Sequence, residues 1–596
     1  MAAFAYSGGA GGIDRAELRA VRDHMSARGP DGSGEWFSHD NRVGLGHRRL
    51  AIIDLSDAGA QPMASADGKL VISFNGEIYN YRELRQQLQA MGRVFRSESD
   101  TEVLLQLYEE YGCAMLSRLR GMFALALWDG RKQRMLLARD AFGIKPLYYA
   151  NDGKTLRAAS QVKALLHADV DRRPEPAGHA GFFLWGSVPS PWTLYRGIRG
   201  LEPGHFMWAS EEGVGTPQPF CLITDLLARA AAQPARGTRG EACEHIAAAL
   251  GACVKAHMVS DVPVGVFLSA GLDSTMLASL ASGQLRTLTL AFSEFAGTAD
   301  DEVPLAEKVA AQLKSRHSTV LTDRKDFEAE RASLMNSMDQ PTIDGVNSWF
   351  VTRAAAAQGI KVALSGLGGD ELFGSYPSFR EVPQLARLAG PLASIPGLGL
   401  AARWISEPVL KRFTSPKYAG LLEYGANLGQ AYLLRRSLNM PWELPRLMDA
   451  DMARQGLHDL QTLSRLSGTF SPIRGSARDR LSVSALEMNW YMRNQLLVDA
   501  DWASMAHSLE VRVPFADVPL LEAVAPWIAA FPDLSKSEVA RATAPRLPAQ
   551  LLEKPKTGFL VPTSSWLMAS DGRKVPRRGL RAWARHVHAS YTVAVS

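Results

Sequence analysis

The first third of the chain alternates short apolar runs with Gly, Asp and Asn turns, a pattern typical of β-strands. One helix is expected over Asp100–Tyr111, because acidic residues fill its first turn, where the helix dipole favours negative charge. The pattern therefore predicts a β-rich α+β domain. The segments with the strongest strand character are Val43–Ile53, Lys69–Phe74, Gly121–Trp128 and Gln133–Arg139.

From Glu241 onward, apolar strand segments alternate with amphipathic helices. The expected order is helix to about Met258, strand to Leu268, helix Ser274–Ala281, strand Arg286–Phe292, helix Pro304–Leu313, strand Ser318–Thr322, helix Val346–Gln358 and strand 361–366. Such alternation predicts an α/β fold with a doubly wound parallel sheet. Residues 380–500 have a mostly helical pattern with many aromatic residues, which either pack between helices or line a cavity.

A looser stretch over Glu211–Gly240, rich in Gly, Pro and Ala, separates the two patterns. We therefore expect one domain at 1–215, a linker at 216–240 and a second domain at 241–596. A chain of 596 residues is also too long for a single core, which agrees with two or three domains.

The composition narrows the function classes. Apolar residues make up 46% and charged residues 21%, which are ordinary values for a globular enzyme. The net charge of +5 is small for this length and no Lys/Arg block stands out, so a nucleic-acid partner is not expected. No segment has the unbroken apolar length of a membrane span or signal peptide, and the four cysteines lack metal or disulfide spacing. A cytoplasmic enzyme is expected.

The most informative segment is Val266–Thr275, which reads as a buried strand, a small polar loop and a helix start. Such a loop directs backbone N–H groups and a helix dipole at one point, as a pyrophosphate site requires. An acid inside that site, Asp273, implies Mg²⁺ between it and the phosphates of ATP. The loop lacks the Gly-Lys-Ser/Thr ending of a P-loop, and an ordinary strand–helix turn is the alternative. The residues expected to contact ATP are Leu268, Ser269, Gly271, Leu272, Asp273 and Ser274.

A second segment, Lys361–Gly374, repeats the arrangement of apolar strand, Ser-Gly loop and acids. Loops that follow parallel strands gather at the carboxyl edge of the sheet, where ligands bind. Ser365, Gly366 and Asp370 are therefore expected to complete the ATP and Mg²⁺ site beside the first loop. Glu371 either supports that site from behind or is merely an acid in the first turn of a helix.

These two segments, together with Met505–Phe515, resemble the synthetase domain of the asparagine synthetase family. The resemblance implies that ATP and a carboxylate give an acyl-adenylate and pyrophosphate, and that an amine then forms an amide. It implies a catalytic Lys556 near the departing pyrophosphate, with an ordinary surface lysine as the alternative, and a catalytic part for Asp370. Glu510 is either a general base for the amine or the partner of Arg512.

The first domain resembles a class II glutaminase of the N-terminal-nucleophile fold, with two stacked antiparallel sheets. The segments that carry this resemblance are Arg28–Gly32, His47–Leu50, Asn75–Asn80 and Ser99–Glu102. An Arg suits a carboxylate, an Asp an ammonium group and an Asn an oxyanion. By resemblance, the glutamine-binding positions are Arg49, Asn75, Gly76, Glu77 and Asp100.

The family's nucleophilic Cys after the first Met is replaced here by Ala2, which cannot attack an amide. Ser7 is the nearest hydroxyl, but it is not terminal, so glutamine hydrolysis is not expected. An engineered change or natural loss would explain Ala2. Ala3, in place of the usual Gly, favours natural loss, because nobody would need to alter that position.

A second departure is Leu367, which stands where relatives that act on free aspartate have Glu, a candidate base for ammonia. Leu367 weakens the expectation of asparagine synthesis without excluding it. In lacking the Cys while keeping both domains, the chain resembles the family branch that includes lasso peptide cyclases, which join a peptide's own amine to a side-chain carboxylate. The expected partners are then a peptide or small-molecule carboxylate and a leader peptidase. An ammonia-dependent asparagine synthetase or small-molecule amidotransferase is the runner-up, and a binding pseudoenzyme is the non-enzyme alternative.

Overall fold

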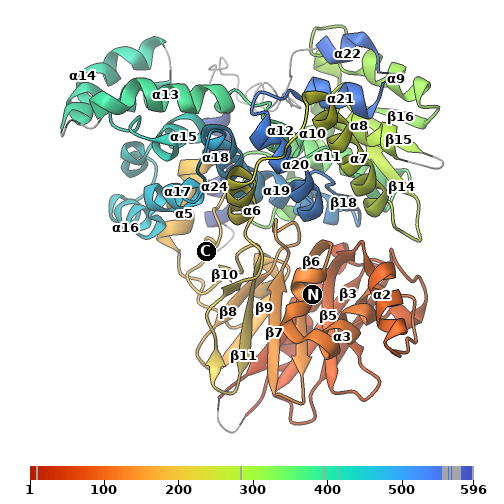
Figure 1. Cartoon of the computed structure of the whole chain (residues 1–596). Helices are drawn as coiled ribbons and strands as arrows, with labels where there is room; N and C mark the ends of the chain where they lie inside the picture. The colour runs from red at the N-terminus through yellow and green to blue at the C-terminus, as the bar shows by residue number, and fades with distance from the viewer. Residues whose placement is uncertain are drawn as a thin grey trace.

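The structure is a computed structural model. It describes residues 1–8, 11–281, 285–393, 395, 397–413, 415–545, 547–553, 562, 566 and 579–593. A β-sandwich forms the lower part of Figure 1, and an α/β domain with a helical region lies above it.

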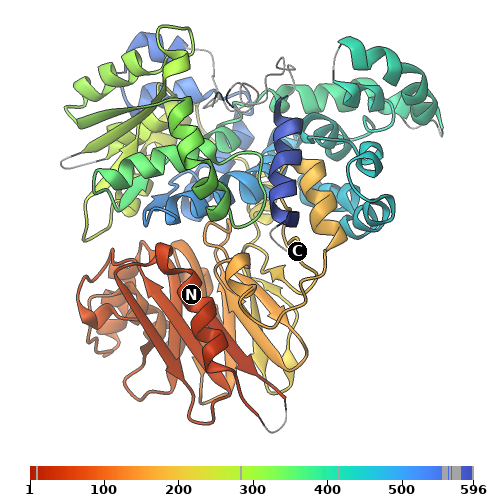
Figure 2. The same cartoon turned by 180° about the vertical axis from the view of Figure 1, so that it is seen from behind.

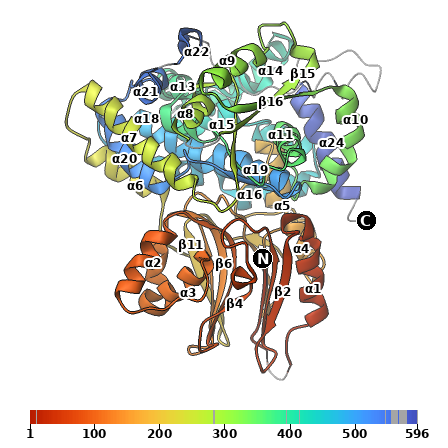
Figure 3. The same ribbon diagram turned by 90° about the vertical axis from the view of Figure 1, so that its right-hand side faces the viewer.

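The sandwich consists of two antiparallel sheets. In Figure 3 the sheets lie side by side, with α1 (Arg15–His24) and α4 (Val162–Leu165) beside one and α2 (Tyr81–Ala90) and α3 (Asp100–Tyr111) beside the other. The first sheet has the order β10 (Arg199–Gly200), β8 (Tyr148–Asn151), β9 (Thr155–Ala159), β1 (Ala2–Tyr6), β3 (Val43–Arg49) and β2 (Gly32–Phe37). The second has the order β12 (Gly213–Val214), β11 (His205–Ser210), β7 (Arg134–Arg139), β6 (Gly121–Asp129), β5 (Leu70–Ile78) and β4 (Met63–Ala64), with β13 (Gln218–Pro219) beside β11.

Alternating residues of both sheets form the core between them, as two-sheet packing requires. Ala3 and Leu45 from one sheet and Val71, Ala124 and Leu137 from the other are completely buried in one cluster. The stacked antiparallel architecture and the helix Asp100–Tyr111 that the sequence predicts are confirmed.

Two predicted strands have different ends in the structure. β3 ends at Arg49 rather than Ile53, because the Arg49 side chain donates to the carbonyls of Asp54 and Ser56 and holds the chain in a turn. β5 continues to Ile78 instead of stopping at Phe74, since β6 pairs with it along its full length. Gly76 allows this close pairing: its φ is +152°, and a Cβ would lie 2.0 Å from the Met122 carbonyl oxygen.

The second domain contains a five-stranded parallel sheet, which confirms the doubly wound prediction. Numbered along the chain within this sheet, the strand order is 3-2-1-4-5, so the direction of winding reverses between the first and fourth strands. In spatial order the strands are β16 (Arg316–Thr322), β15 (Arg286–Phe292), β14 (Val264–Phe267), β17 (Val362–Leu364) and β18 (Glu510–Arg512).

Helices cover both faces of this sheet (Figure 1). They are α7 (Arg239–His257), α8 (Leu272–Leu280), α9 (Val303–Gln312), α10 (Arg324–Ser337), α11 (Val346–Ala357), α12 (Gly369–Phe373), α19 (Leu497–Met505), α20 (Val518–Ala530), α21 (Lys536–Thr543) and α22 (Ala549–Glu553). The sequence pattern predicted α7, α8, α9 and α11 within a few residues, but α10 was not predicted.

Residues 380–500 are mostly helical, as expected. The elements are α13 (Ser378–Ala393), α14 (Leu398–Phe413), α15 (Leu428–Arg436), α16 (Ala450–Leu460), α17 (Thr462–Phe470), α18 (Arg478–Leu486) and a π-helix at Glu487–Leu496, with α24 (Gly579–Val593) beside them in Figure 2. A helix from the first part of the chain, α5 (Pro176–Trp185), packs against α16 in this region. The approach is close, since a Cβ on Gly456 would lie 2.2 Å from the Pro176 carbonyl oxygen.

The segment 216–240, which we expected to be a linker, contains β13 and a full helix, α6 (Ile223–Ala232). α6 buries Ile223, Leu226 and Leu227, and it packs against α20. Its Ala-rich sequence is a good helix former, and an apolar face at helical spacing accounts for its docking.

Buried ion pairs join the sandwich to the second domain. Arg28 binds Asp501 through two hydrogen bonds of 2.7 and 2.9 Å, and both side chains are only 7% exposed. Arg120 binds Asp517 in the same two-point manner, at 2.9 Å for each bond. Such planar, doubly bonded pairs fix orientation as well as distance.

Within the described part of the chain, no single helix is both long and apolar enough to cross a membrane. The bent pair Ser378–Ala393 and Leu398–Leu410 passes that test of length and composition only when its two helices are taken together.

Candidate functional site

Two loops meet at the point where the winding of the parallel sheet reverses. The first follows β14 and leads into α8, and the second follows β17 and leads into α12. Because β14 and β17 are parallel neighbours, their carboxyl ends place both loops at the same edge. This is where an open α/β sheet binds its ligands.

The first loop is shaped by its own hydroxyl groups. The Ser274 hydroxyl accepts a hydrogen bond from the Ser269 backbone N–H at 3.1 Å and lies 3.0 Å from the Ser269 hydroxyl. The Gly271 N–H donates to the Ser269 hydroxyl at 3.2 Å, and Thr275 donates to the Gly271 carbonyl at 2.8 Å. These bonds hold the loop open at the N-terminus of α8, an arrangement that binds phosphate well.

The second loop approaches the first through glycines. A Cβ on Gly366 would lie 2.9 Å from the Asp273 Cβ, and one on Gly369 would lie 2.2 Å from Asp273 Oδ1. Gly368 has a φ of +94°, which residues with a side chain adopt only under strain. Glycine is therefore needed at these positions for the two loops to lie together.

A lysine that the sequence analysis missed joins the two loops. Lys536, at the start of α21, places its Nζ 2.6 Å from Asp273 Oδ2 and 2.5 Å from Asp370 Oδ1. Burial disfavours its charge, but the two carboxylates outweigh burial, so the pKa of Lys536 is raised. The Ser535-x-x-Glu538 capping box in the sequence indicates that a helix begins here. It does not indicate that the Lys536 side chain points toward the two loops.

These loops line a cavity of about 480 Å³. The structure brings together in its wall every described residue that the sequence predicted for ATP or metal: Leu268, Ser269, Gly271, Leu272, Asp273, Ser274, Ser365, Gly366 and Asp370. Leu367 also lines it. Two carboxylates beside hydroxyl and backbone donors form an oxygen-rich set that suits Mg²⁺ with a nucleotide.

Glu371 lies in the first turn of α12 and also lines the cavity. It is fully buried and accepts a hydrogen bond from the Tyr376 hydroxyl at 3.0 Å. Burial, with smaller contributions from Asp370 and Glu487, raises its pKa to about 7. Asp344 and Tyr491 are further wall residues that the sequence analysis did not single out.

Most aromatic residues of the helical region pack against one another instead of lining the cavity. Trp490 lies 5.2 Å from Trp185, and Tyr424 lies 5.6 Å from Trp442, measured between ring centroids. Among the described residues of 380–500, Tyr491 is the aromatic that reaches the cavity wall.

Glu510 lies on the opposite side of β18 from the cavity. Val511 lines the cavity, whereas Glu510 accepts a hydrogen bond from Arg512 Nε at 2.9 Å and lies 3.6 Å from Lys145 of the sandwich. Side chains alternate along a strand, so Glu510 and Arg512 face the sandwich together. The geometry favours the ion-pair alternative for Glu510. Lys556 lies outside the described residues.

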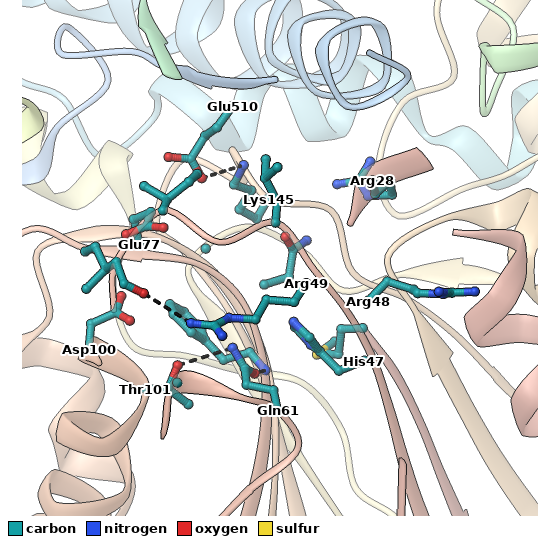
Figure 4. Close-up of a pocket in the computed structure, with 18 of the residues that line it drawn as sticks. Arg28, His47, Arg48, Arg49, Gln61, Glu77, Asp100, Thr101, Lys145 and Glu510 are labelled. Carbon is teal, nitrogen blue, oxygen red and sulfur yellow. Dashed lines mark hydrogen bonds and ion pairs between the residues drawn. The ribbon is translucent and has the colours of Figure 1, made fainter. Parts of the chain in front are cut away.

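A second, smaller pocket of about 60 Å³ lies where the sandwich meets β18 (Figure 4). Its lining includes all five residues expected at a glutamine site: Arg49, Asn75, Gly76, Glu77 and Asp100. Lys145 of the sandwich and Glu510 of the second domain complete the wall, and Figure 4 shows both near Glu77.

The polar groups of this small pocket are largely occupied by the protein itself. Arg49 donates to backbone carbonyls of the turn after β3, and Asn75 donates to the Ser160 hydroxyl at 3.2 Å. Asp100 accepts from the Ile78 N–H at 3.0 Å, and burial raises its pKa to about 6. Burial and the nearby Glu510 also raise the pKa of Glu77.

None of the four cysteines lines this pocket, and neither does Ala2, whose side chain is fully buried in β1. Ser7 lies at the far end of β1, where its hydroxyl donates to the Lys154 carbonyl at 3.1 Å. No thiol or terminal hydroxyl therefore stands among the described lining residues of the small pocket.

A sandwich that carries a glutamine-type pocket, followed by a parallel sheet with an ATP-type cavity, is the architecture of ATP-dependent carbon–nitrogen ligases that form AMP. Residues 7–220 match the glutamine amidotransferase domain, and residues 245–592 match asparagine synthase. The chain belongs to the asparagine synthetase family.

Relatives are similar along nearly the whole chain. A Mycobacterium tuberculosis protein, provisionally named asparagine synthetase (glutamine-hydrolysing), is 34% identical over 96% of this chain and 88% of its own. Asparagine synthetase (glutamine-hydrolysing) 1 of Bacillus subtilis is 31% identical over 96% of this chain and 87% of its own. Among solved structures, glutamine phosphoribosylpyrophosphate amidotransferase of B. subtilis aligns with 54% of this chain and 91% of its own, at 14% identity and a TM-score of 0.30.

Proposed function

We propose that the protein is a peptide macrolactam synthetase of the lasso cyclase kind. It adenylates a side-chain carboxylate of a peptide and joins that carboxylate to the peptide's own terminal amine, with release of AMP and pyrophosphate. The observation that carries the proposal is the contrast between its two sites: the ATP-type cavity keeps all its expected described residues, whereas the described lining of the glutamine-type pocket contains no thiol or terminal hydroxyl.

The contrast supports an amine that does not come from glutamine. An intramolecular amine needs no ammonia, so the glutaminase nucleophile becomes dispensable. Leu367 in the cavity wall agrees with this, because the acid that relatives place there would serve a free ammonia molecule. Holding both ends of one peptide in a cavity also supplies proximity, worth up to ~7–11 kcal/mol in favourable cases.

Residue roles follow from this proposal. Ser269, Ser274 and the backbone N–H groups of the first loop would bind the departing pyrophosphate, and Lys536 would balance its charge. Asp273 and Asp370 would hold Mg²⁺, which neutralises phosphate charge when bound.

A small-molecule ligase is the competing function. An asparagine synthetase that uses free ammonia would need the same ATP cavity and no glutaminase nucleophile. The similarity to proteins named asparagine synthetase favours this reading, and Leu367 argues against it. A binding pseudoenzyme is a weaker competitor, because Asp273, Asp370 and Lys536 remain in mutual contact.

One pair of reactions decides between these functions. The purified full chain is incubated with MgATP and either free aspartate with ammonium chloride or a leader-trimmed precursor peptide, if necessary delivered by a leader peptidase. We expect the peptide to lose the mass of one water, with AMP formed in equal amount, and aspartate to give almost no asparagine. Efficient asparagine formation would reject the cyclase proposal and establish the runner-up.

A further inference from the structure

The wall of the large cavity includes polar residues outside the two loops expected to bind ATP. Asp344, Asn347 and Ser348 come from the start of α11, Tyr376 follows α12, and Tyr491 comes from the π-helix. π-Helical turns are rare and are frequently found at functional sites, because they shift side chains out of the regular helical register.

Asp344 is held firmly in this wall. Its Oδ1 accepts a hydrogen bond from the Gly345 N–H at 2.9 Å, and its own N–H donates to the Thr342 hydroxyl at 3.2 Å. Thr342 in turn donates to Asp499 at 3.0 Å. Gly345 has a φ of +85°, and a Cβ there would lie 2.6 Å from the Trp502 ring, so this turn requires glycine.

The two tyrosines form an aromatic corner next to Asp344. Their ring centroids lie 5.9 Å apart with the planes at 78°. Arg436 packs over both rings from behind, 4.5 Å from the Tyr376 centroid and 4.1 Å from that of Tyr491. Asp344 and Tyr491 line the same cavity, and burial, followed by the negative charge of Asp344, raises the pKa of Tyr491.

Glu371 supplies an acceptor atom that has no partner. Its Oε1 binds the Tyr376 hydroxyl, whereas Oε2 is buried without a hydrogen bond from any described residue. A buried carboxylate oxygen left in this state is costly unless a donor from a ligand satisfies it. Glu371 belongs to the wall of the cavity, so a ligand held there is the candidate donor.

The charged residues of the cavity wall indicate which kind of ligand group would donate a hydrogen bond to Glu371. Among the described lining residues, Asp273, Asp344, Asp370 and Glu371 are acidic, and Lys536 is the basic one. Lys536 contacts Asp273 and Asp370, so its charge is balanced by these two acids. Asp344 and Glu371 are the remaining acids of the wall. Burial raises the pKa of both, and an ammonium group bound beside them would favour their charged forms, as the aromatic faces of Tyr376 and Tyr491 would favour the same cation.

We infer that Asp344, Glu371, Tyr376 and Tyr491 form a subsite that binds the protonated amine of a peptide, the group that is to be joined to the adenylated carboxylate. This inference rests on the proposed function and deepens it, because it names the residues that bind the amine. Ammonia would need no aromatic corner, whereas the first residue of a peptide can pack its backbone against the tyrosines.

The test is a binding titration that needs no knowledge of the carboxylate. Glycylglycinamide carries a protonated terminal amine at neutral pH and no carboxylate, and its N-acetyl form lacks the charge. Calorimetric titrations of the full chain with each probe, and with ammonium chloride, are made with and without MgATP. We expect glycylglycinamide to bind and the acetylated form and ammonium to bind at least 10-fold more weakly, roughly the loss of one charge-assisted hydrogen bond.

Two variants and a control locate the site. Asp344→Asn should raise the dissociation constant for glycylglycinamide about 10-fold and leave MgATP binding unchanged. Asp300→Asn, which alters an exposed acid outside the cavity, should change neither. If Asp344→Asn fails to fold, as lost MgATP binding would reveal, Tyr491→Leu gives the decision and should likewise weaken the amine.

Several outcomes would overturn the inference. If glycylglycinamide binds equally to the wild type and to both variants, the amine binds at another place in the protein. If it does not bind to the wild type at all, the proposed subsite does not exist. Ammonium bound as tightly as glycylglycinamide would reject a peptide amine. Absence of MgATP binding to the wild type would reject the proposed function, and the titration without nucleotide would still decide the amine subsite.

Discussion

The two pockets of this molecule differ in the space that their polar groups enclose. In the large cavity, about 480 Å³, the hydroxyl and carboxylate groups of the loops after β14 and β17 bind one another and Lys536, and they still border open space. In the small pocket, about 60 Å³, Arg49, Asn75 and Asp100 bind neighbouring parts of the protein. Residues typical of a binding site can therefore persist for structural reasons alone.

The position of the small pocket between the two domains indicates which structural contacts its residues make. Glu510 of β18 and Lys145 of the sandwich form part of its wall, and Arg512 lies 3.7 Å from Glu77. The pocket is thus a section of the buried, charged contact between domains. Removing one partner of such a cluster leaves an uncompensated buried charge, which is strongly destabilising.

The largest expected effect concerns the large cavity. Asp273→Asn and Asp370→Asn should each lower AMP formation about 100-fold or more, because one carboxylate charge beside the phosphates is lost. The measurement is AMP release with the substrate that the proposed function identifies, and Asp300→Asn on the surface is the matched control. Near-normal AMP formation in either variant would remove that carboxylate from the site.

The next effect concerns Lys536, whose side chain is 9% exposed between two carboxylates. Lys536→Met leaves Asp273 and Asp370 facing each other without a cation, and breaking such a buried pair costs about 3 kcal/mol of unfolding free energy. Urea denaturation measures this loss. Millimolar Mg²⁺ should restore part of it in the variant by taking the place of the ammonium group, and a variant indifferent to Mg²⁺ would contradict a shared cation site.

A third effect tests the small pocket through pH. The pKa of Asp100 is raised from 3.8 to about 6, mainly by burial, so the folded protein resists ionisation that the unfolded chain undergoes freely. This acid's contribution to stability is complete below about pH 4 and is lost as the pH rises through about 6. Asp100→Asn avoids that loss, so the variant should gain stability over the wild type as the pH rises through this window, reaching on the order of 3 kcal/mol above it.

Urea midpoints of both proteins at several pH values give this difference, and Asp57→Asn, at an exposed acid, is the control. A constant difference between wild type and Asp100→Asn at every pH would show that Asp100 ionises normally. Asn keeps an oxygen that can accept from the Ile78 N–H, so the variant changes the charge and little else.

The last prediction is that the protein will show no measurable glutaminase activity. Glutamine should give no glutamate above background, because no cysteine lines the small pocket. Ala2→Cys alone should not restore hydrolysis, since Ala2 is buried in β1 outside the pocket wall. A glutamate assay with and without ATP measures both proteins, and sustained turnover by the wild type would require another nucleophile.

The sequence predicted the nucleotide loops well because each is a local unit of strand, loop and helix. Hydrophobic periodicity marks the strand, and Ser, Gly and Asp mark the loop. The roles assigned to these residues stay predictions until the variants are measured. Lys536, Asp344 and Tyr491 were missed because they reach the cavity from distant segments, and periodicity carries no information about such long-range contacts.

Local patterns also failed where side chains redirect the chain. The apolar residues after Arg49 have the pattern of a continuing strand. The strand nevertheless ends at Arg49, because the hydrogen bonds of its side chain hold the following backbone in a turn. The stretch 216–240 has the Gly and Pro content of a linker, but the Ala-rich part within it folds as α6 against α20. Both features are local: Arg49 binds carbonyls at most seven positions along the chain, and the Ala-rich part of 216–240 is itself a good helix former.

α5 comes from the first part of the chain but packs against α16 of the helical region, and this has a consequence for protein synthesis. α5 leaves the ribosome long before its partner α16, so the part of its buried surface that α16 covers stays exposed while the intervening chain is made. Contacts between segments so far apart form late and slow the folding of a chain. A nascent chain that stops before α16 would expose an apolar helix, and we expect it to depend on chaperones until α16 emerges.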